Sequence, residues 1–372
     1  MRYYLVAGEA SGDLHASNLM SALLIDDSEA DFRFLGGDLM SKIGGFRVHH
    51  FRDTAYMGIW PVLAHIQTIF KRGREIFRDI ATWNPDVVIL IDCPGFNLPI
   101  ASLVRKKLSI PVVYYISPKI WAWKSYRIKR IRRDVTELFS ILPFEPAYYK
   151  QRGFSVKYVG NPSLDAIEEF RNSSSSGRDY GDKPLLTLLP GSRKQEIKRN
   201  LSIMLKTVRE IDGFQIVVAG APSIEKEYYQ SLLKDTDIKV FFEQTYELLE
   251  KSYVAIITSG TATLETALFG IPQVVCYYMP FGGVVSFLRK MFLKIKYISL
   301  VNIIAGREVV PELVAGKMTA TNLKKELLPL LSDTEERAKQ LKGYNDVRKL
   351  LGPTGASKNA ARGIIRLLKE KR

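Results

Sequence analysis

Short apolar runs rich in β-branched residues recur along the whole chain and alternate with segments of helical period. Near-continuous apolar runs of this kind are typical of parallel strands that helices cover on both faces. The pattern therefore predicts an α/β fold with a doubly wound parallel sheet that occurs twice. The predicted strands are 3–8, 32–37, 86–92, 111–117, 137–142 and 156–161 in the first half, and 185–191, 215–220, 239–242, 254–260 and 272–279 in the second.

A polar segment interrupts this alternation near the middle of the chain. Residues 171–184 (RNSSSSGRDYGDKP) replace the apolar period with serine, glycine and charge, as linkers do. The length of 372 residues also fits two domains of ordinary size. After the last strand the sequence predicts helices from about 319 to 370. We expect domains at 1–170 and 171–345, with a final helix at 346–372 that packs across the join.

The composition limits the compartment and the partners. Lys and Arg total 54 against 39 acidic residues, and this net charge of +15 favours anionic partners: nucleic acid, phosphorylated small molecules or an acidic lipid surface. Two cysteines, Cys93 and Cys276, supply neither a disulfide framework nor a zinc site, which fits a reducing, cytoplasmic compartment. No run reaches the roughly 18 apolar residues of a membrane span, so a membrane would be met only from its surface.

Two loops after predicted strands of the first half carry carboxylates. The loop GEASGD (8–13) lacks the second glycine of a dinucleotide fingerprint and the ending of a Walker loop. It is either a tight strand-to-helix turn or, through Glu9 and Asp13, the edge of an active site. The loop LIDCPGFN (90–97) sets Asp92 at the end of an apolar strand, where a carboxylate is costly to desolvate. Asp92 is therefore either catalytic or a structural helix cap.

Two further loops, in the second half, favour anion binding. In LPGSRKQEI (189–197), Ser192 and Gln195 have the spacing of a capping box. A cation is unfavourable at a helix N-terminus, so Arg193 argues instead for a phosphate bound together with Gly191 and Ser192.

The loop TSGTATLETALFGIP (258–272) is the most specific of the four. Its Ser259, Gly260 and Thr261 are small residues at a predicted helix start, where backbone N–H groups suit a phosphate. Glu265 follows one turn later, where a carboxylate can accept hydrogen bonds from sugar hydroxyls.

Together these loops resemble a known family. AGEASGD, MGI (57–59), IDCPGFN, YISPKIWAW, LPFE (142–145), LLPGSR..EI, SGTATLE and NIIAGRE (302–308) occur in this order. The chain resembles the lipid-A-disaccharide synthases, which are inverting glycosyltransferases of the GT-B type, from residue 1 to about 315. The resemblance implies two facing Rossmann-like domains, with the sugar nucleotide held mainly by the second.

The resemblance also implies a reaction. It is the transfer of 2,3-diacylglucosamine from UDP to 2,3-diacylglucosamine 1-phosphate, which gives a β-1,6-linked disaccharide 1-phosphate and UDP. By resemblance, Asp92 matches an aspartate proposed for catalysis and Arg193 matches the arginine of the PGSR motif, while Asn302 and Arg307 lie near the donor. The chain departs from the family at Asn161, where histidine is usual, and at Gly95, so that Asp92 is the motif's only carboxylate.

An inverting displacement needs a base for the acceptor hydroxyl and stabilisation of the departing UDP. We expect Asp92 to be the base, with Asp13 or Glu9 as the alternatives. Arg193 and the N–H groups of both second-half loops would neutralise UDP, and Glu265 would hold the ribose. We expect neither a cofactor, since UDP-sugar is a substrate, nor a metal, since the only D-x-D (235–237) lies in a polar stretch.

Two amphipathic segments suggest contact with lipid. On a helix, 284–296 and 57–77 would each carry an apolar stripe flanked or followed by Lys and Arg. Such helices suit an anionic lipid interface, although 284–296 could equally face a core. The residues expected to contact lipid or acyl chains are Ile66, Ile69, Phe70, Phe287 and Phe292.

The segment SPKIWAWKSYRIKRIRR (117–133) combines an aromatic part with a basic tail. We expect Trp121 and Trp123 to shape the acceptor side of the cleft. Since nothing else in the sequence supplies a base-reading module, we expect no nucleic-acid partner for the tail. A phosphorylated acceptor on an anionic membrane explains it, with a solvated helix face as the alternative.

The expected location is therefore peripheral, on the inner face of the cytoplasmic membrane, with a homodimer left open. Three rival functions remain. One is another GT-B transferase or a sugar-nucleotide epimerase with a water-soluble substrate. The others are a nucleic-acid-binding protein and a non-catalytic nucleotide-binding scaffold.

Overall fold

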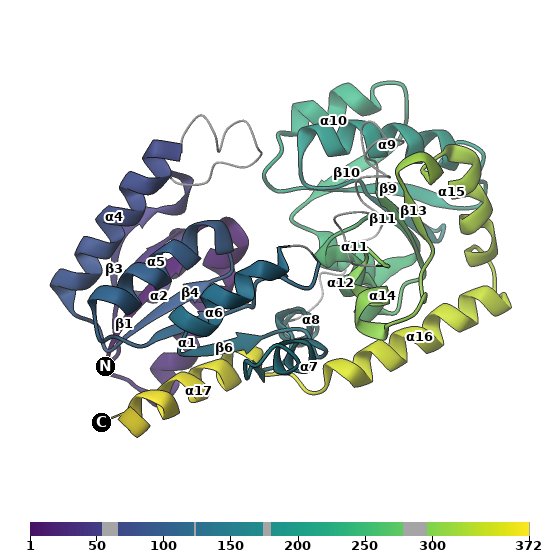
Figure 1. The fold of residues 1–372 in the computed structure, drawn as a ribbon. Coiled ribbons are helices and arrows are strands. Elements are labelled where there is room, and N and C mark those ends of the chain that lie inside the picture. The colour runs from purple at the N-terminus through teal and green to yellow at the C-terminus, as the bar shows by residue number, and fades with distance from the viewer. Residues whose placement is uncertain (54–65, 123, 174–179, 278–295, 372) are drawn as a thin grey trace. The chain divides into compact units, whose positions relative to one another are not determined.

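The computed structural model describes residues 1–53, 66–122, 124–173, 180–277 and 296–371 (Figure 1). The chain divides into two compact units, Met1–Pro162 with Pro353–Arg372, and Ser163–Gly352. The second unit begins ahead of the polar segment because helix α8 (Pro162–Asn172) packs with it. The Phe170 ring on α8 meets the Tyr246 ring edge-on, with the ring centroids 5.6 Å apart.

The first unit is built on one seven-stranded sheet in the order β3-β2-β1-β4-β5-β6-β7. All neighbouring strands are parallel. The strands are β1 (Arg2–Ala7), β2 (Asp31–Gly36), β3 (Phe46–His50), β4 (Val87–Ile91), β5 (Val112–Tyr115), β6 (Glu137–Ser140) and β7 (Lys157–Tyr158).

Helices cover both faces of this sheet (Figure 1). Successive strand residues alternate between the faces, so Tyr3 and Leu5 belong to one buried cluster and Tyr4 and Val6 to another. The final helix joins the first cluster through side chains such as Ile364. The helices are α1 (Ala10–Asp26), α2 (Asp38–Ile43), α4 (Ile66–Trp83), α5 (Pro94–Lys107), α6 (Ile128–Asp134), α7 (Glu145–Lys150) and α17 (Ala356–Lys371).

The second unit repeats the plan with a six-stranded parallel sheet in the order β10-β9-β8-β11-β12-β13. Its strands are β8 (Leu185–Leu189), β9 (Gln215–Gly220), β10 (Lys239–Phe242), β11 (Ser252–Thr258), β12 (Gln273–Tyr277) and β13 (Glu312–Val314). Besides α8, its helices are α9 (Lys194–Val208), α10 (Lys226–Leu233), α11 (Thr245–Lys251), α12 (Thr261–Phe269), α14 (Leu300–Ala305), α15 (Ala320–Leu327) and α16 (Glu335–Leu351).

All eleven predicted strands are present, and the two-sheet α/β prediction is confirmed. Strands β3 and β13, which each lie at the edge of a sheet, were not predicted. No residue of β3 is fully buried, and β13 has only three residues, so neither produces a buried apolar run. Among the described residues, no helix is long and apolar enough to cross a membrane.

Candidate active site

The carboxylates Glu9 and Asp92 meet at the carboxyl edge of the first sheet. Strands β1 and β4 are neighbours in the sheet although other strands separate them in the chain. Their register pairs Ala7 with Ile91, so the loops that carry Glu9 and Asp92 leave the sheet side by side. This is the point where the strand order reverses, and open α/β sheets bind their ligands there.

The backbone at Asp92 is unusual and is held by its surroundings. Asp92 and Cys93 both have a φ of 43°, a conformation that costs about 1–3 kcal/mol for a residue other than glycine. The Asp92 N–H donates to the carbonyl oxygen of Tyr115 (3.1 Å). The Asp92 carbonyl oxygen accepts from the buried Asn97 amide (2.9 Å) and from the Tyr114 hydroxyl. Sequence reasoning missed Asn97 and Tyr114, although strain maintained by buried partners is typical of functional sites.

The pKa of the Asp92 carboxyl lies closer to neutral pH than that of an exposed aspartate. Burial raises its pKa to about 6, the nearby negative charge of Glu9 adds to the rise, and the positive charge of Lys119 opposes it. The Ser11 hydroxyl donates to Glu9 (3.2 Å). A carboxylate that titrates near its working pH is well suited to take a proton from a hydroxyl group.

Asp13 has a different role from its neighbours in the loop. Its buried carboxylate accepts the N–H groups of Gly37 (2.7 Å), Leu39 (3.1 Å) and Met40 (3.2 Å) at the start of α2. A Cβ atom on Gly37 would lie 2.5 Å from an Asp13 oxygen, so only glycine fits there. These bonds occupy both oxygens of Asp13, and we assign it to anchoring α2 instead of to catalysis.

Helix α7 clamps the loop that follows β5. The Trp121 Nε1–H donates to Glu145 Oε1 (2.9 Å), and the Tyr149 and Tyr148 hydroxyls donate to the carbonyl oxygens of Pro118 (3.0 Å) and Ile120 (3.3 Å). Trp121 is only 9% exposed, so most of its surface packs against the protein.

Glu145 is expected to act as a pH-dependent part of this clamp. Burial raises its pKa to about 7, so the folded protein holds it protonated well above the pKa of 4.5 that it has when exposed. Its stabilising contribution is complete below that lower pKa and is lost as the pH rises through about 7. We predict that Glu145→Gln, which keeps an acceptor for Trp121, gains stability over the wild type between pH 5 and pH 8 in urea denaturation.

Glu145→Ala is the contrasting variant for the clamp. It leaves the buried indole N–H without its acceptor and should cost about 1–3 kcal/mol at every pH. If the two variants behave alike at pH 8, the indole bond does not hold the loop.

In the second unit, the two predicted anion loops follow adjacent strands, β8 and β11. The register pairs Leu189 with Ile257, so both loops leave the sheet at the same edge. The buried Asn200 of α9 ties them together, since its amide donates to the Pro190 carbonyl oxygen (3.1 Å) and to Thr258 Oγ1 (2.8 Å). Sequence reasoning missed Asn200, because nothing near it in the sequence shows which loops it will join.

Helix α9 starts one residue later than a capping box would place it. Arg193 is the cap residue itself, with an extended backbone and an exposed side chain, and the Ser192–Gln195 box does not form. The Ser192 N–H donates to Glu196 instead (3.1 Å). Gly191 has a φ of 123°, a conformation that glycine adopts readily. This loop therefore presents an arginine and backbone N–H groups together.

Helix α12 begins at Thr261, directly after Gly260, and its first N–H groups lack acceptors within the helix. The Ser259 hydroxyl donates to the Ile298 carbonyl oxygen (3.0 Å), which fixes the loop. The positive end of a helix dipole suits a phosphate at this place. One turn later, Glu265 accepts a hydrogen bond from the Tyr246 hydroxyl (3.2 Å), and burial raises its pKa.

The side chains of Asn302 and Arg307 have partners in the chain around β13 and on α16. The fully buried Asn302 amide bonds the N–H groups of Val309 (2.7 Å) and Val310 (3.0 Å) and the Glu312 carboxylate (2.9 Å). Arg307 forms an ion pair with Asp346 of α16. We assign the Asn302 side chain to building the edge of the second sheet around β13.

Asn161, where the family usually has histidine, is buried, and its amide donates to the Ile141 carbonyl oxygen (2.9 Å). Several expected lipid and acceptor contacts lie outside the residues that the structure describes. These are Trp123, Phe287, Phe292 and the side chains of Ile66, Ile69 and Phe70.

Similarity to known proteins agrees with this geometry. The chain is 36% identical to the lipid-A-disaccharide synthase of Myxococcus xanthus over 376 aligned positions, which cover 99% of this chain and 97% of the relative. Among solved structures, it resembles the S. aureus MnaA–UDP co-structure (TM-score 0.70, 15% identity, covering 99% and 97% of the two chains). It also resembles a spinosyn rhamnosyltransferase (TM-score 0.58, 13% identity, covering 99% and 100%).

At such low identity the two solved structures establish the fold alone. The sequence model of the family described as lipid-A-disaccharide synthetase matches residues 3–364. With a match of this length and a relative of this similarity, the chain belongs to the lipid-A-disaccharide synthetase family.

Proposed function

We propose that this chain is the hexosyltransferase that forms the lipid A disaccharide. It transfers 2,3-diacylglucosamine from its UDP conjugate to 2,3-diacylglucosamine 1-phosphate, and it releases UDP. The family match over residues 3–364 carries this proposal. The two switch-point sites supply the groups that the reaction needs: a carboxylate of raised pKa in the first unit and anion-binding loops in the second.

The mechanism that these groups favour is a single in-line displacement. The acceptor 6-hydroxyl attacks the anomeric carbon of the donor and gives its proton to Asp92, while the bond from that carbon to the UDP oxygen breaks. Arg193 and the N–H groups at the start of α12 stabilise the negative charge on UDP. Glu265 binds the ribose hydroxyls, and Tyr246 holds its carboxylate in place.

The decisive test is a reconstitution with defined substrates. The purified chain is incubated with UDP-2,3-diacylglucosamine and the monosaccharide 1-phosphate, and the products are identified by mass spectrometry. The proposal expects equal amounts of disaccharide 1-phosphate and UDP. If the folded protein yields no disaccharide, the proposal fails. Epimerisation of a water-soluble UDP-sugar would instead favour the rival function.

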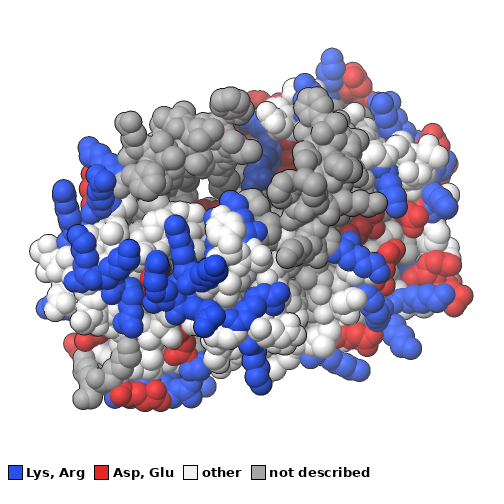
Figure 2. All heavy atoms as spheres, viewed as in Figure 1, with Lys and Arg blue, Asp and Glu red and all other residues white. Residues whose placement is uncertain are grey.

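We also propose that the enzyme works at the inner face of the cytoplasmic membrane. Figure 2 shows Lys and Arg side chains gathered on the first unit over α5 and α6. Arg133 of α6 donates to the Ser102 hydroxyl of α5 (3.0 Å), so the two helices present one basic surface. Acidic headgroups attract such a surface. Its cations are Arg105, Lys106 and Lys107 on α5 and Lys129, Arg130 and Arg132 on α6.

Neutralising Lys129, Arg130 and Arg132 to glutamine should weaken binding to phosphatidylglycerol vesicles. Each cation near an acidic surface contributes about 1 kcal/mol, so the triple variant should lose on the order of 100-fold in affinity at low salt. Flotation of vesicles measures this, with phosphatidylcholine vesicles as the uncharged comparison.

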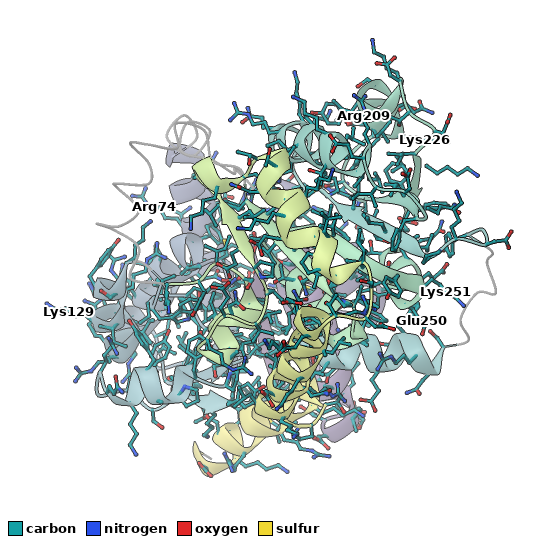
Figure 3. The ribbon with its side chains drawn as sticks, turned by 90° about the vertical axis from the view of Figure 1, so that its right-hand side faces the viewer. Arg74, Lys129, Arg209, Lys226, Glu250 and Lys251 are labelled. Carbon is teal, nitrogen blue, oxygen red and sulfur yellow. The ribbon has the colours of Figure 1, made fainter. Side chains whose placement is uncertain are left out.

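The matched control neutralises three exposed cations of the second unit, Arg209, Lys226 and Lys251, seen with Lys129 in Figure 3. This control should bind like the wild type. Equal losses in the two triple variants would show that only net charge matters.

A further inference from the structure

Lys119 lies on the loop that leaves the carboxyl edge of the first sheet beside Asp92. Strands β4 and β5 are neighbours whose register pairs Ile91 with Tyr115. The Asp92 N–H also donates to the Tyr115 carbonyl oxygen (3.1 Å). The chain after Tyr115 therefore leaves the sheet beside Asp92, and Lys119 follows four residues later.

The backbone on both sides of Lys119 is fixed. The carbonyl oxygen of Pro118 accepts from the Tyr149 hydroxyl, and that of Ile120 accepts from the Tyr148 hydroxyl. Pro118 and Ile120 are buried, whereas Lys119 between them is exposed. The α7 clamp thus presents one cation to solvent from a loop that cannot easily move, which favours recognition of a ligand at a defined place.

A second cation, Arg127, lies at the same edge of the sheet. It ends the short 3₁₀ helix η2 (Ser125–Arg127) and directly precedes α6, whose Arg133 donates to Ser102 of the neighbouring helix α5. Helix α5 begins two residues after Asp92, so α5 and α6 both start at this edge. Burial raises the pKa of Cys93 and of Tyr114, and the positive charge of Arg127 opposes both rises. The charge of Lys119 likewise opposes the rises in pKa that burial causes at Asp92 and Glu145, so both cations act on groups at this edge of the sheet.

Neither cation is neutralised by a carboxylate in direct contact. Within the described chain, no ion pair within 4.0 Å involves Lys119 or Arg127. Glu9 and Asp92 carry carboxyl groups at the same edge of the sheet, but neither forms an ion pair with Lys119 or Arg127 in the described chain. An anionic group can therefore bind both side chains without displacing an existing partner.

We propose that Lys119 and Arg127 bind the phosphate monoester of the acceptor and so select a phosphorylated sugar. This assignment rests on the proposed function, in which the acceptor has a hydroxyl for Asp92 at one end and a phosphate at the other. A phosphate monoester carries close to two negative charges at neutral pH and accepts several charge-assisted hydrogen bonds. Holding the phosphate would also orient the hydroxyl toward Asp92.

The test compares two acceptors that differ only in the phosphate. Lys119→Met and Arg127→Met are assayed in neutral detergent micelles, at saturating donor, with 2,3-diacylglucosamine 1-phosphate and with 2,3-diacylglucosamine. We expect each variant to lose roughly 10- to 100-fold in kcat/KM for the phosphorylated acceptor, the usual effect of losing a hydrogen bond to a charged group. The unphosphorylated acceptor should change by less than about 3-fold, and Lys119→Arg should recover most of the loss.

Each other outcome overturns the assignment. Equal losses with both acceptors would mean that the cations serve Asp92 and not the phosphate. A raised KM for the donor would place them on the UDP side, and unchanged kinetics would remove them from the site. Losing binding to anionic vesicles while acceptor discrimination stays intact would assign them to lipid headgroups. If the wild type makes no disaccharide from either acceptor, the proposed function fails first. Lys226→Met, on the second unit, controls for the loss of one exposed cation.

Discussion

Replacing Asp92 by asparagine is expected to abolish transfer and, at the same time, to stabilise the protein above neutral pH. Asparagine tolerates the left-handed backbone that Asp92 adopts, so the loop should keep its shape. The variant cannot accept the proton of the acceptor hydroxyl, and kcat should fall by about 10²- to 10⁴-fold. Mass spectrometry of the disaccharide over time measures this loss.

The pH dependence follows from the same group. The wild-type kcat/KM should rise with pH through about 6, because the base works only when it is ionised and its pKa lies there. A carboxyl whose pKa is raised in the folded state stabilises the protein at low pH, and this contribution is lost as the pH rises through about 6. Asp92→Asn should therefore exceed the wild type in stability by roughly 1–3 kcal/mol at pH 8.

Asp13→Asn is the matched control, because it changes the buried carboxylate of the neighbouring loop. Its carboxylate receives three backbone N–H groups, so this variant should lose about 1–2 kcal/mol of stability and keep the pH profile. A wild-type profile that stays flat from pH 5 to 7, or substantial transfer by Asp92→Asn, would rule out Asp92 as the base.

Replacing Arg193 by methionine is expected to reduce kcat by about 10²- to 10³-fold. Arg193 is exposed at the cap of α9, where a cation gains nothing from the helix dipole in the absence of an anion. Arg193→Lys should restore little, since an ammonium group cannot make the paired hydrogen bonds of a guanidinium group.

Steady-state kinetics and calorimetric titration with UDP measure the two effects, and thermal unfolding checks the fold. Lys198→Met removes an exposed cation from the same helix and should behave like the wild type. UDP affinity and kcat within about 3-fold of the wild type would separate Arg193 from the leaving group.

Much of the fold and of the site followed from the sequence because its signals are local. A strand covered on both faces needs a continuous apolar run, so the eleven predicted strands could be read directly from the chain. In a parallel sheet the residue after each strand lies at one edge, which predicted where Asp92 and Ser259 stand. The order of the motifs indicated the family, and the family match agrees with it.

The remaining assignments depended on residues that are distant in the sequence. Asp13 is an anchor because α2 brings three N–H groups to it, and Asn302 is structural because the chain before β13 folds back around it. Trp121 is buried because Glu145, on α7, accepts its indole proton.

The sequence by itself determined that the chain builds two parallel sheets with polar loops at their carboxyl edges. Only the tertiary structure decided which of those polar side chains stay available for chemistry. Burial and neighbouring charge, which set the pKa of Asp92 near 6, come from Glu9, Lys119 and the packing around them. When a hydrogen-bond partner belongs to another helix, strand or loop, the sequence around a residue does not show which partner it will have. The role of Asn200 is visible only in the folded chain, because the two loops that it joins are distant from each other in the sequence.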